Sequence, residues 1–350
     1  MPRLEPRAAP SGLMAVLSPV LALAATALFG AALFAALGKD PVAGLRVFFV
    51  TPLETARGLA EVGLKMTPLL LCALGLALCY RANVWNIGAE GQFLAGAIAA
   101  TGVALLVPKG AAPAAVLAVV LAGMLGGMAW ASLTAILRDR FNANEILVSL
   151  MLTYVAQLLL LYLVNGPWRD PAGMNFPVTP LFDAAARVPL ILPPYRVNWG
   201  FVLALLMVAA VWVFLSRSRA GFRLEVSGHA PLAARFAGFS SREGIWVSLL
   251  ACGALAGLAG AFEAAGPLGQ LTAQVSTGTG FAAIIVAWLG RLSPVGCLFG
   301  AFVMALIVIG GELSQSRLGL PAAIGGVFQG VLLLALLTAD TLIHYRVRWR

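Results

Sequence analysis

Residues 67–92 read TPLLLCALGLALCYRANVWNIGAEGQ, an apolar run that passes directly into a polar segment containing two glycines. The apolar part belongs to a run that begins near residue 62 and has about the length needed to cross a hydrocarbon core of roughly 30 Å. The polar part leads straight into the next apolar run. Irregular backbone at membrane depth must be buried in protein or line a watery cavity. This stretch therefore predicts a membrane protein with interrupted spans.

Composition places the whole chain in a bilayer. Of its 350 residues, 61% are hydrophobic and 11% are charged, whereas soluble domains carry about 25% charged residues. We therefore expect a single transmembrane domain over residues 1–350, surrounded by membrane lipid. The four cysteines lie in or beside apolar runs and form no CxxC pair. They are expected to be core residues, with neither disulfides nor a metal site.

The apolar runs predict ten spans, at residues 13–37, 62–80, 87–107, 112–137, 145–165, 197–216, 245–265, 278–290, 294–312 and 321–343. The first run is longer than the apolar core of a signal peptide, so we expect it to be retained. Cytoplasmic loops are enriched in Lys and Arg. Placing both termini inside puts fourteen arginines against six acids there, and nine basic residues against six acids outside. The net charge of +9 thus follows mostly from topology and indicates no nucleic-acid partner.

Ten spans divide into two halves of five, and an odd number in each half predicts that the second half is inverted. In each half the join between the second and third span is irregular, at residues 80–92 and 266–280. By analogy with secondary transporters, such joins at corresponding positions point to the transport pathway. Two loops are long: a proline-rich external loop at 166–196 and a basic internal loop at 217–244.

The first join supplies polar candidates for the pathway. If the segment were helical, Asn83, Asn86 and Glu90 would share one face. A carboxylate in a span is costly and is a functional-site hypothesis by default. Glu90 could bind substrate hydroxyls or ring nitrogens, or it could pair with Arg81 or a backbone amide to hold the break in shape. We favour the structural role. Trp85 and Gln92 complete the candidates in this join.

The second join supplies three more pathway candidates, Glu263, Gln270 and Thr277. Glu263 lies beside a face of small residues spaced three and four apart, which predicts close helix packing. A buried structural acid is the favoured interpretation of Glu263. The polar residues that follow could line a pathway or belong to an ordinary external loop. The small residues are Gly253, Gly257, Gly260 and Ala264.

In the internal loop, Pro231 and Gly238 bracket a predicted helix of about two turns that presents Ala233 and Ala234 outward. It could insert into a groove on a partner, or it could be an amphipathic connector lying on the membrane surface. The sequence contains few residues suited to catalysis, because it has only two histidines and no Gly-Lys-Ser/Thr phosphate loop. We therefore expect no enzyme activity and no cofactor, and any ATP must bind another subunit.

Several motifs occur in an order that resembles one family. Residues 86–92 (NIGAEGQ) look like a signature of ABC importer permeases of the nucleoside and simple-sugar branch. Residues 144–154 (NEILVSLMLTY) resemble its second motif, in which the family often has Asn where this chain has Thr153. Further matches lie at 233–238, 278–291 and 321–330. The resemblance covers the chain from about residue 66 to the C-terminus, within the broader group that also serves branched-chain amino acids and ribose.

This resemblance implies a type II-importer-like permease that carries nucleosides, nucleobases or simple sugars across a bacterial cytoplasmic membrane. It implies an ABC ATPase subunit, a second permease in a heterodimer or homodimer, and an extracytoplasmic substrate-binding lipoprotein. The internal helix becomes a coupling helix, with Leu232 in place of the acid of the E-A-A-x-x-x-G motif. A proton-coupled secondary transporter using Glu90 and Glu263 is the alternative. The expected coupling residues are Gly228, Leu232, Ala233, Ala234, Arg235 and Gly238.

Overall fold

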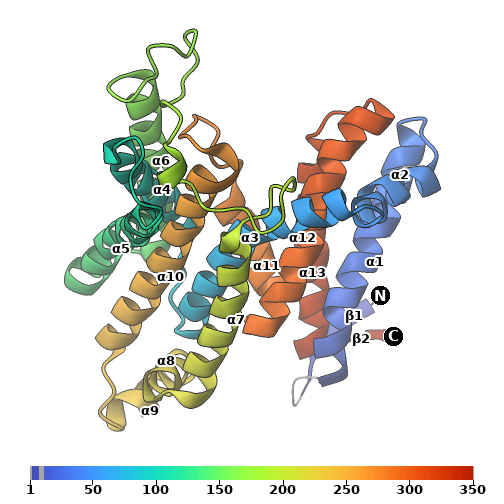
Figure 1. Ribbon diagram of the computed structural model, residues 1–350. Helices are drawn as coiled ribbons and strands as arrows, with labels where there is room; N and C mark the ends of the chain where they lie inside the picture. Colours follow the sequence, from blue (N-terminus) through green and yellow to red (C-terminus); the bar gives the residue numbers. More distant parts are fainter. Residues whose placement is uncertain (1, 8–11, 350) are drawn as a thin grey trace. The chain divides into compact units, whose positions relative to one another are not determined.

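A computed structural model describes residues 2–7 and 12–349 of the chain. These residues form two compact units: the described residues up to 62 together with those from 302 onward, and residues 63–301 (Figure 1). The helices are α1 (Gly12–Ala36), α2 (Pro41–Phe49), α3 (Ala56–Arg81), α4 (Ala89–Leu106), α5 (Ala115–Phe141), α6 (Glu145–Asn165), α7 (Trp199–Arg217), α8 (Arg219–His229), α9 (Pro231–Phe236), α10 (Ser241–Glu263), α11 (Thr279–Leu289), α12 (Pro294–Leu318) and α13 (Ile324–His344). Short 3₁₀ turns η1 (Thr51–Leu53) and η2 (Ala184–Ala186), a π turn η3 (Ala264–Leu268), and strands β1 (Pro2–Pro6) and β2 (Tyr345–Trp349) complete the order.

The expected polytopic, helical class is confirmed. Nine helices in the described residues are long and apolar enough to cross a membrane. The tenth predicted span is α11, which has 11 residues and at 1.5 Å per residue is only about 16 Å long. It is too short to cross the hydrocarbon core alone, so the prediction of a full span at 278–290 was wrong. The inverted repeat stays a prediction.

The first unit is held by aromatic packing. Phe34 of α1, Phe48 of α2 and Phe328 of α13 are fully buried, and the rings of Phe48 and Phe328 stack with centroids 4.3 Å apart. Gly30 of α1 makes room for this cluster, because a Cβ there would collide with the Phe328 ring. Strands β1 and β2 pair antiparallel, with Pro2 opposite Trp349. This small ribbon is an addition that the helical prediction did not contain.

The second unit is built on close packing of α4, α5 and α10. A Cβ on Gly257 of α10 would collide with the backbone of Gly123 of α5, and one on Gly96 of α4 would collide with Gly257. Such approach of backbones is the reason for small residues at intramembrane interfaces. The small-residue face predicted along 253–264 is thus a packing surface in the described structure. Glu263 ends α10 beside it.

Loops of the second unit gather at two ends. At the loop end, residues 166–196 pair with the backbone after α10: the Phe182 N–H donates to the Gly269 carbonyl (2.8 Å) and the Val188 N–H to that of Ala265 (2.8 Å). At the other end, here named the α9 end, Arg242 Nε donates to Asp139 Oδ2 (2.6 Å). Figure 1 shows α8 and α9 far from the long loop. Segments that the distribution of charged residues assigned to the same side of the membrane therefore lie at the same end of this unit.

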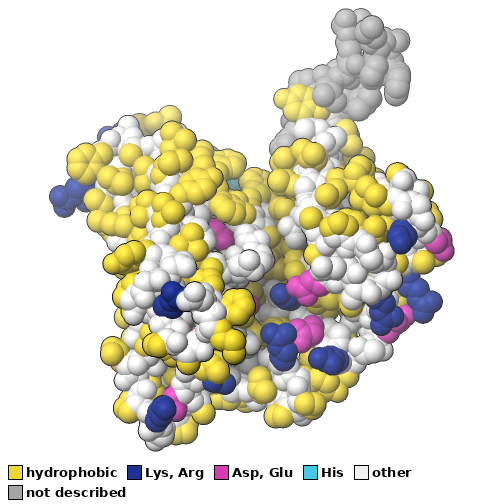
Figure 2. Space-filling view, turned by 90° about the horizontal axis from the view of Figure 1, so that it is seen from above, with side chains coloured by type: hydrophobic (Ala, Val, Ile, Leu, Met, Phe, Trp, Pro, Cys, Tyr) yellow, Lys and Arg dark blue, Asp and Glu magenta, His cyan; other side chains and the backbone are white. Residues whose placement is uncertain are grey.

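Apolar side chains cover much of the molecular surface (Figure 2). In the spans of α5, α6 and α7 only 22% of the residues are buried. Their exposed residues are nevertheless large and hydrophobic, including Leu121, Leu158 and Trp212. A surface of this kind fits lipid or another membrane-spanning subunit.

Candidate functional site

The carboxylate of Glu90 binds the start of α11. Glu90 lies in the first turn of α4, is 5% exposed, and its Oε2 accepts a hydrogen bond from the Gly280 N–H (2.6 Å). Just before α11, the N–H groups of Gly278 and Thr279 donate to Ser276 Oγ (3.3 and 3.1 Å). A negative group at a helix N-terminus is stabilised by unpaired N–H groups and by the helix dipole. This geometry supports the structural role, with a backbone amide as the partner and not Arg81.

Gly280 makes this contact possible. It follows Thr279, the first residue of α11, and a Cβ at position 280 would collide with the backbone nitrogen of Glu90. The two interrupted regions of the sequence thus meet backbone to backbone. Only glycine fits at that approach.

The segment between α3 and α4, residues 82–88, is not helical. Asn83 adopts a left-handed conformation (φ 56°) and is exposed, whereas Asn86 is fully buried. The condition under which Asn83, Asn86 and Glu90 would share one face, a helical segment, is therefore not met. The helix ends at Arg81 because the left-handed residue that follows terminates it, a conformation that Asn tolerates better than most residues.

Asn86 is the hub of this segment. Its side-chain amide donates to Cys252 Sγ (3.2 Å) and Gln92 Oε1 (3.4 Å), and its Oδ1 accepts from the Gly88 N–H (2.9 Å). The Tyr80 hydroxyl donates to the Asn86 carbonyl (3.1 Å). One buried side chain thereby joins the break to α4 and α10. Cys252 and the other three cysteines are buried, as predicted.

The two motifs at 86–92 and 144–154 pack against each other. Gly88 faces Ser149 and Gly91 faces Thr153, where added Cβ atoms would come within 2.7 Å of Ser149 Cβ and 2.8 Å of Thr153 Cα. The Ser149 hydroxyl accepts from the Ile87 N–H (3.2 Å). Thr153, where the family pattern often has Asn, is buried and its hydroxyl donates to the Ser149 carbonyl (3.0 Å).

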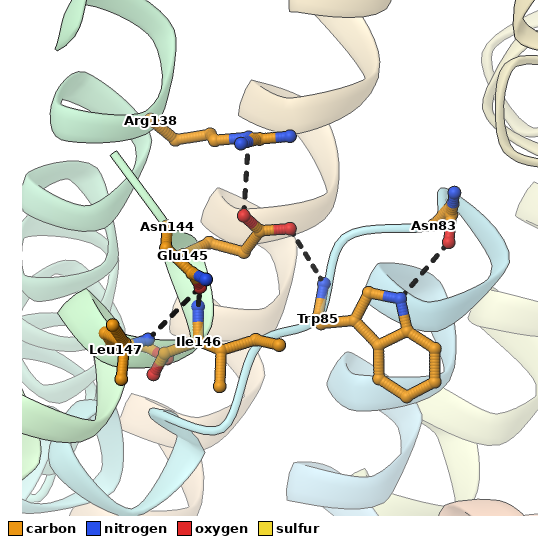
Figure 3. A network of polar contacts seen from close by, with 8 residues as sticks. Asn83, Trp85, Arg138, Asn144, Glu145, Ile146 and Leu147 are labelled. Carbon is orange, nitrogen blue, oxygen red and sulfur yellow. Dashed lines mark hydrogen bonds and ion pairs between the residues drawn. The ribbon is translucent and has the colours of Figure 1, made fainter. Parts of the chain in front are cut away.

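Glu145, the first residue of α6, holds the same segment in place (Figure 3). Its carboxylate pairs with Arg138 Nε (3.4 Å) and accepts from the Trp85 N–H (3.5 Å). The Trp85 indole N–H donates to Asn83 Oδ1 (3.2 Å), and the Asn144 side chain caps α6 through the Ile146 N–H (2.9 Å). The second motif therefore holds the break between α3 and α4 in shape.

Sequence reasoning missed an aromatic cluster at the α9 end. The rings of Tyr80, Trp85 and Trp288 lie with centroids 5.6–6.0 Å apart. Trp85 is 44% exposed. No sequence signal joins these residues, because Trp288 of α11 is some two hundred positions from the other two and only the fold brings it there.

The eight predicted pathway residues do not form one cluster. Asn86 and Gln92 bond to each other in the core, Glu90 binds α11, and Asn83 and Trp85 are exposed. In the second region, Glu263 and Gln270 are half-buried and Thr277 is exposed. Whether any of them contacts a substrate stays a prediction.

The predicted coupling helix is α9, a helix of six residues that ends before Gly238 (φ 81°). One detail was wrong: Ala234 is 3% exposed and faces inward, because α9 packs against α8 and α10 on that side. Ala233 is exposed as expected, and Arg235 and Gly238 are exposed as well. Leu232 (74% exposed) and Phe236 (93% exposed), four positions apart, form an apolar ridge. Phe236 was not among the predicted coupling residues.

The described residues contain nine helices long and apolar enough to cross a membrane, a shorter apolar helix, and two interrupted joins in contact, as expected for a polytopic permease. Comparison with known protein families defines the class of permease more narrowly. The family model described as branched-chain amino acid transport system / permease component matches residues 58–337, and the chain belongs to this family.

Curated relatives cover most of the chain. A glucose ABC transporter permease protein of Haloferax volcanii is 36% identical over 99% of this chain and 93% of its own length. A guanosine permease of Bacillus subtilis is 31% identical over 77% and 78%, and a nucleoside permease of Lactococcus lactis is 29% identical over 84% and 83%. These relatives are transport permease subunits and not enzymes. No solved structure matches.

Proposed function

We propose that this chain is the transmembrane permease subunit of an ATP-driven importer for nucleosides or related nucleobases and simple sugars. It receives substrate from an extracytoplasmic binding protein and passes it across the cytoplasmic membrane. Both termini and the α9 end face the cytoplasm, and the long loop faces outward. A second permease subunit, most often a different chain in this branch, completes the pore.

The observation that carries this proposal is the ridge of Leu232 and Phe236. Two large apolar side chains exposed by 74% and 93% on a six-residue helix are costly to leave in water and suit insertion into a groove of a partner. The ridge lies in a loop rich in arginine, the composition of a cytoplasmic segment. An ABC ATPase subunit that docks there would supply the ATP site.

The substrate class rests on similarity together with the character of the pathway candidates. The names of the relatives include glucose, guanosine and nucleosides, all small polar solutes. The intramembrane carboxylate of Glu90 is already engaged by the start of α11. A transport path without a free fixed charge suits neutral solutes. The binding protein would then determine which substrate is selected. It also weakens the alternative of proton coupling through Glu90.

The test is ATPase association measured by co-purification from membranes. Leu232→Glu with Phe236→Glu should weaken association about 30-fold, because losing a central apolar anchor costs about 2 kcal/mol or more. The matched control is Met174→Glu, which changes a residue 88% exposed at the loop end and should leave association unchanged. Equal association of the double variant and the control would remove the docking role from α9.

A further inference from the structure

Helix α11 is anchored at both ends by side chains from two other helices. At its start, Gly280 N–H donates to Glu90 of α4. At its far end, Arg81 of α3 donates from Nε to the carbonyl of Leu292 (2.8 Å), in the turn that leads into α12. The second anchor is the one that reaches toward α8 and α9.

The turn after α11 is strained. Arg291 (φ 52°) and Leu292 (φ 55°) are consecutive non-glycine residues in the left-handed region. Each such residue costs about 1–3 kcal/mol and persists only where its surroundings hold it. Here the Leu292 N–H donates to the Ala287 carbonyl (2.8 Å), and the Leu292 carbonyl accepts from Arg81. The hydrogen bond from Arg81 is thus one of the contacts that stabilise this strained turn.

The same guanidinium group holds α8. Arg81 Nη1 pairs with Glu225 Oε1 of α8 at 3.0 Å, with the Arg81 side chain 22% exposed. The planar guanidinium carries several fixed donors, so Arg81 can serve Leu292 and Glu225 together. A lysine ammonium in its place would not reproduce this two-way geometry.

Backbone packing makes the link stiff. Gly228 of α8 lies against the end of α3 so closely that a Cβ there would collide with the Arg81 carbonyl oxygen. Helix α9 follows directly after α8, joined through Ala230, whose N–H donates to the Val226 carbonyl (2.9 Å). A displacement of the exposed ridge on α9 therefore reaches Arg81 through α8 without a flexible linker.

We propose that Arg81 is the positioning residue that transmits movement of α8 and α9 to α11 by holding Glu225 and the strained Leu292 turn at once. This inference rests on the proposed docking of an ATPase at α9. Pulling α8 moves the guanidinium, loosens the Leu292 turn and lets α11 shift. Trp288, on the last turn of α11 against Tyr80 and Trp85, moves with it.

The chain offers a matched control. Arg223, also on α8, pairs with Glu243 Oε1 at 3.5 Å, and both side chains are about half exposed (47% and 45%). Neither residue touches α11 in the described contacts. Arg223→Gln removes the same charge and the same kind of ion pair from the same region, without the connection to Leu292.

The experiment measures the number of ATP molecules hydrolysed per substrate imported, in proteoliposomes holding the complete transporter. Arg81→Gln should raise this ratio about tenfold, within the usual range of coupling between two sites, with ATPase association intact. Arg81→Lys should behave similarly. Glu225→Gln, which keeps the Leu292 bond, should have a smaller effect, and Arg223→Gln none.

A second readout does not depend on activity. Amide hydrogen exchange over residues 287–293 should respond to a trapped nucleotide state in the wild type and lose that response in Arg81→Gln. A wild-type ratio of ATP hydrolysed to substrate imported, together with a wild-type exchange response, in Arg81→Gln would overturn the inference. A proportional fall of both uptake and ATP hydrolysis in this variant would also overturn it. Absence of ATP-dependent uptake by the wild-type transporter would instead contradict the proposed function.

Discussion

The two interrupted regions of the second unit are stabilised in different ways. The break after α3 is seven residues long and is held by buried side chains, chiefly Asn86, with Glu145 and Ser149 from α6. The break after α10 spans residues 264–278 and is held by backbone pairing with the long loop, through Ala265, Gly269 and Leu271. The first break is thus fixed by core polar groups, and the second depends on a loop that meets the outer partner in the proposed function.

This difference predicts rigidity at the first break and responsiveness at the second. A polar network in a low-dielectric core is costly to leave partly satisfied. The second break is bonded through its backbone to the long loop, so a partner that displaces this loop also displaces the break, although the paired residues are themselves buried. A binding protein docking on the long loop would therefore act first on the second break, and from there on Gly278 and Gly280 at the start of α11.

The largest expected effect is at the first break. Asn86→Ala removes the donors and acceptor that serve Cys252, Gln92 and Gly88, and we expect a loss of about 2–3 kcal/mol of stability. Thermal unfolding in detergent followed by fluorescence measures it. The control is Asn83→Gly, which keeps the left-handed conformation at an exposed position. Equal losses in the two variants would contradict the hub role of Asn86.

The next effect is at the contact between the two breaks. Gly280→Ala should destabilise more than Glu90→Gln, because the added Cβ meets the Glu90 backbone while Gln retains an acceptor oxygen. We expect about 2 kcal/mol for the first and about 1 kcal/mol for the second. Thermal unfolding in detergent followed by fluorescence measures both losses. A larger loss in Glu90→Gln would show that the charge itself, and not the approach, holds the contact.

The smallest expected effect is at the second break. Thr179 is fully buried and its hydroxyl accepts from the Leu271 N–H (2.9 Å). Thr179→Val should cost about 1 kcal/mol and speed proteolysis of the long loop. Thr277→Val, at an exposed position of the same break, should change neither. If the long loop is cleaved at the same rate in both variants, its hydrogen bond to Leu271 does not keep the loop ordered.

The sequence predicted features that depend on local pattern. Span positions follow from apolar length, the breaks from polar and glycine content, and the tight face of α10 from the spacing of Gly253, Gly257 and Gly260. Each of these is a property of neighbouring residues along the chain. The ends of the helices were predicted within several residues for the same reason.

Features set by packing between distant segments were not predictable. Ala234 turned inward because α8 and α10 lie on that side of α9, and Arg81 bonds to Glu225 and Leu292 instead of Glu90. The break after α3 is not helical, and Asn86 within it bonds to partners on α4 and α10. In each case the deciding partner lies on another element, often more than a hundred positions away.

The measurement that tests the account most directly is uptake of labelled guanosine and glucose into proteoliposomes containing the permease pair, the ATPase subunit and the binding protein. We expect uptake of at least one solute that requires ATP and is lost in Leu232→Glu with Phe236→Glu. Uptake driven by a proton gradient alone, without the ATPase subunit, would contradict the account.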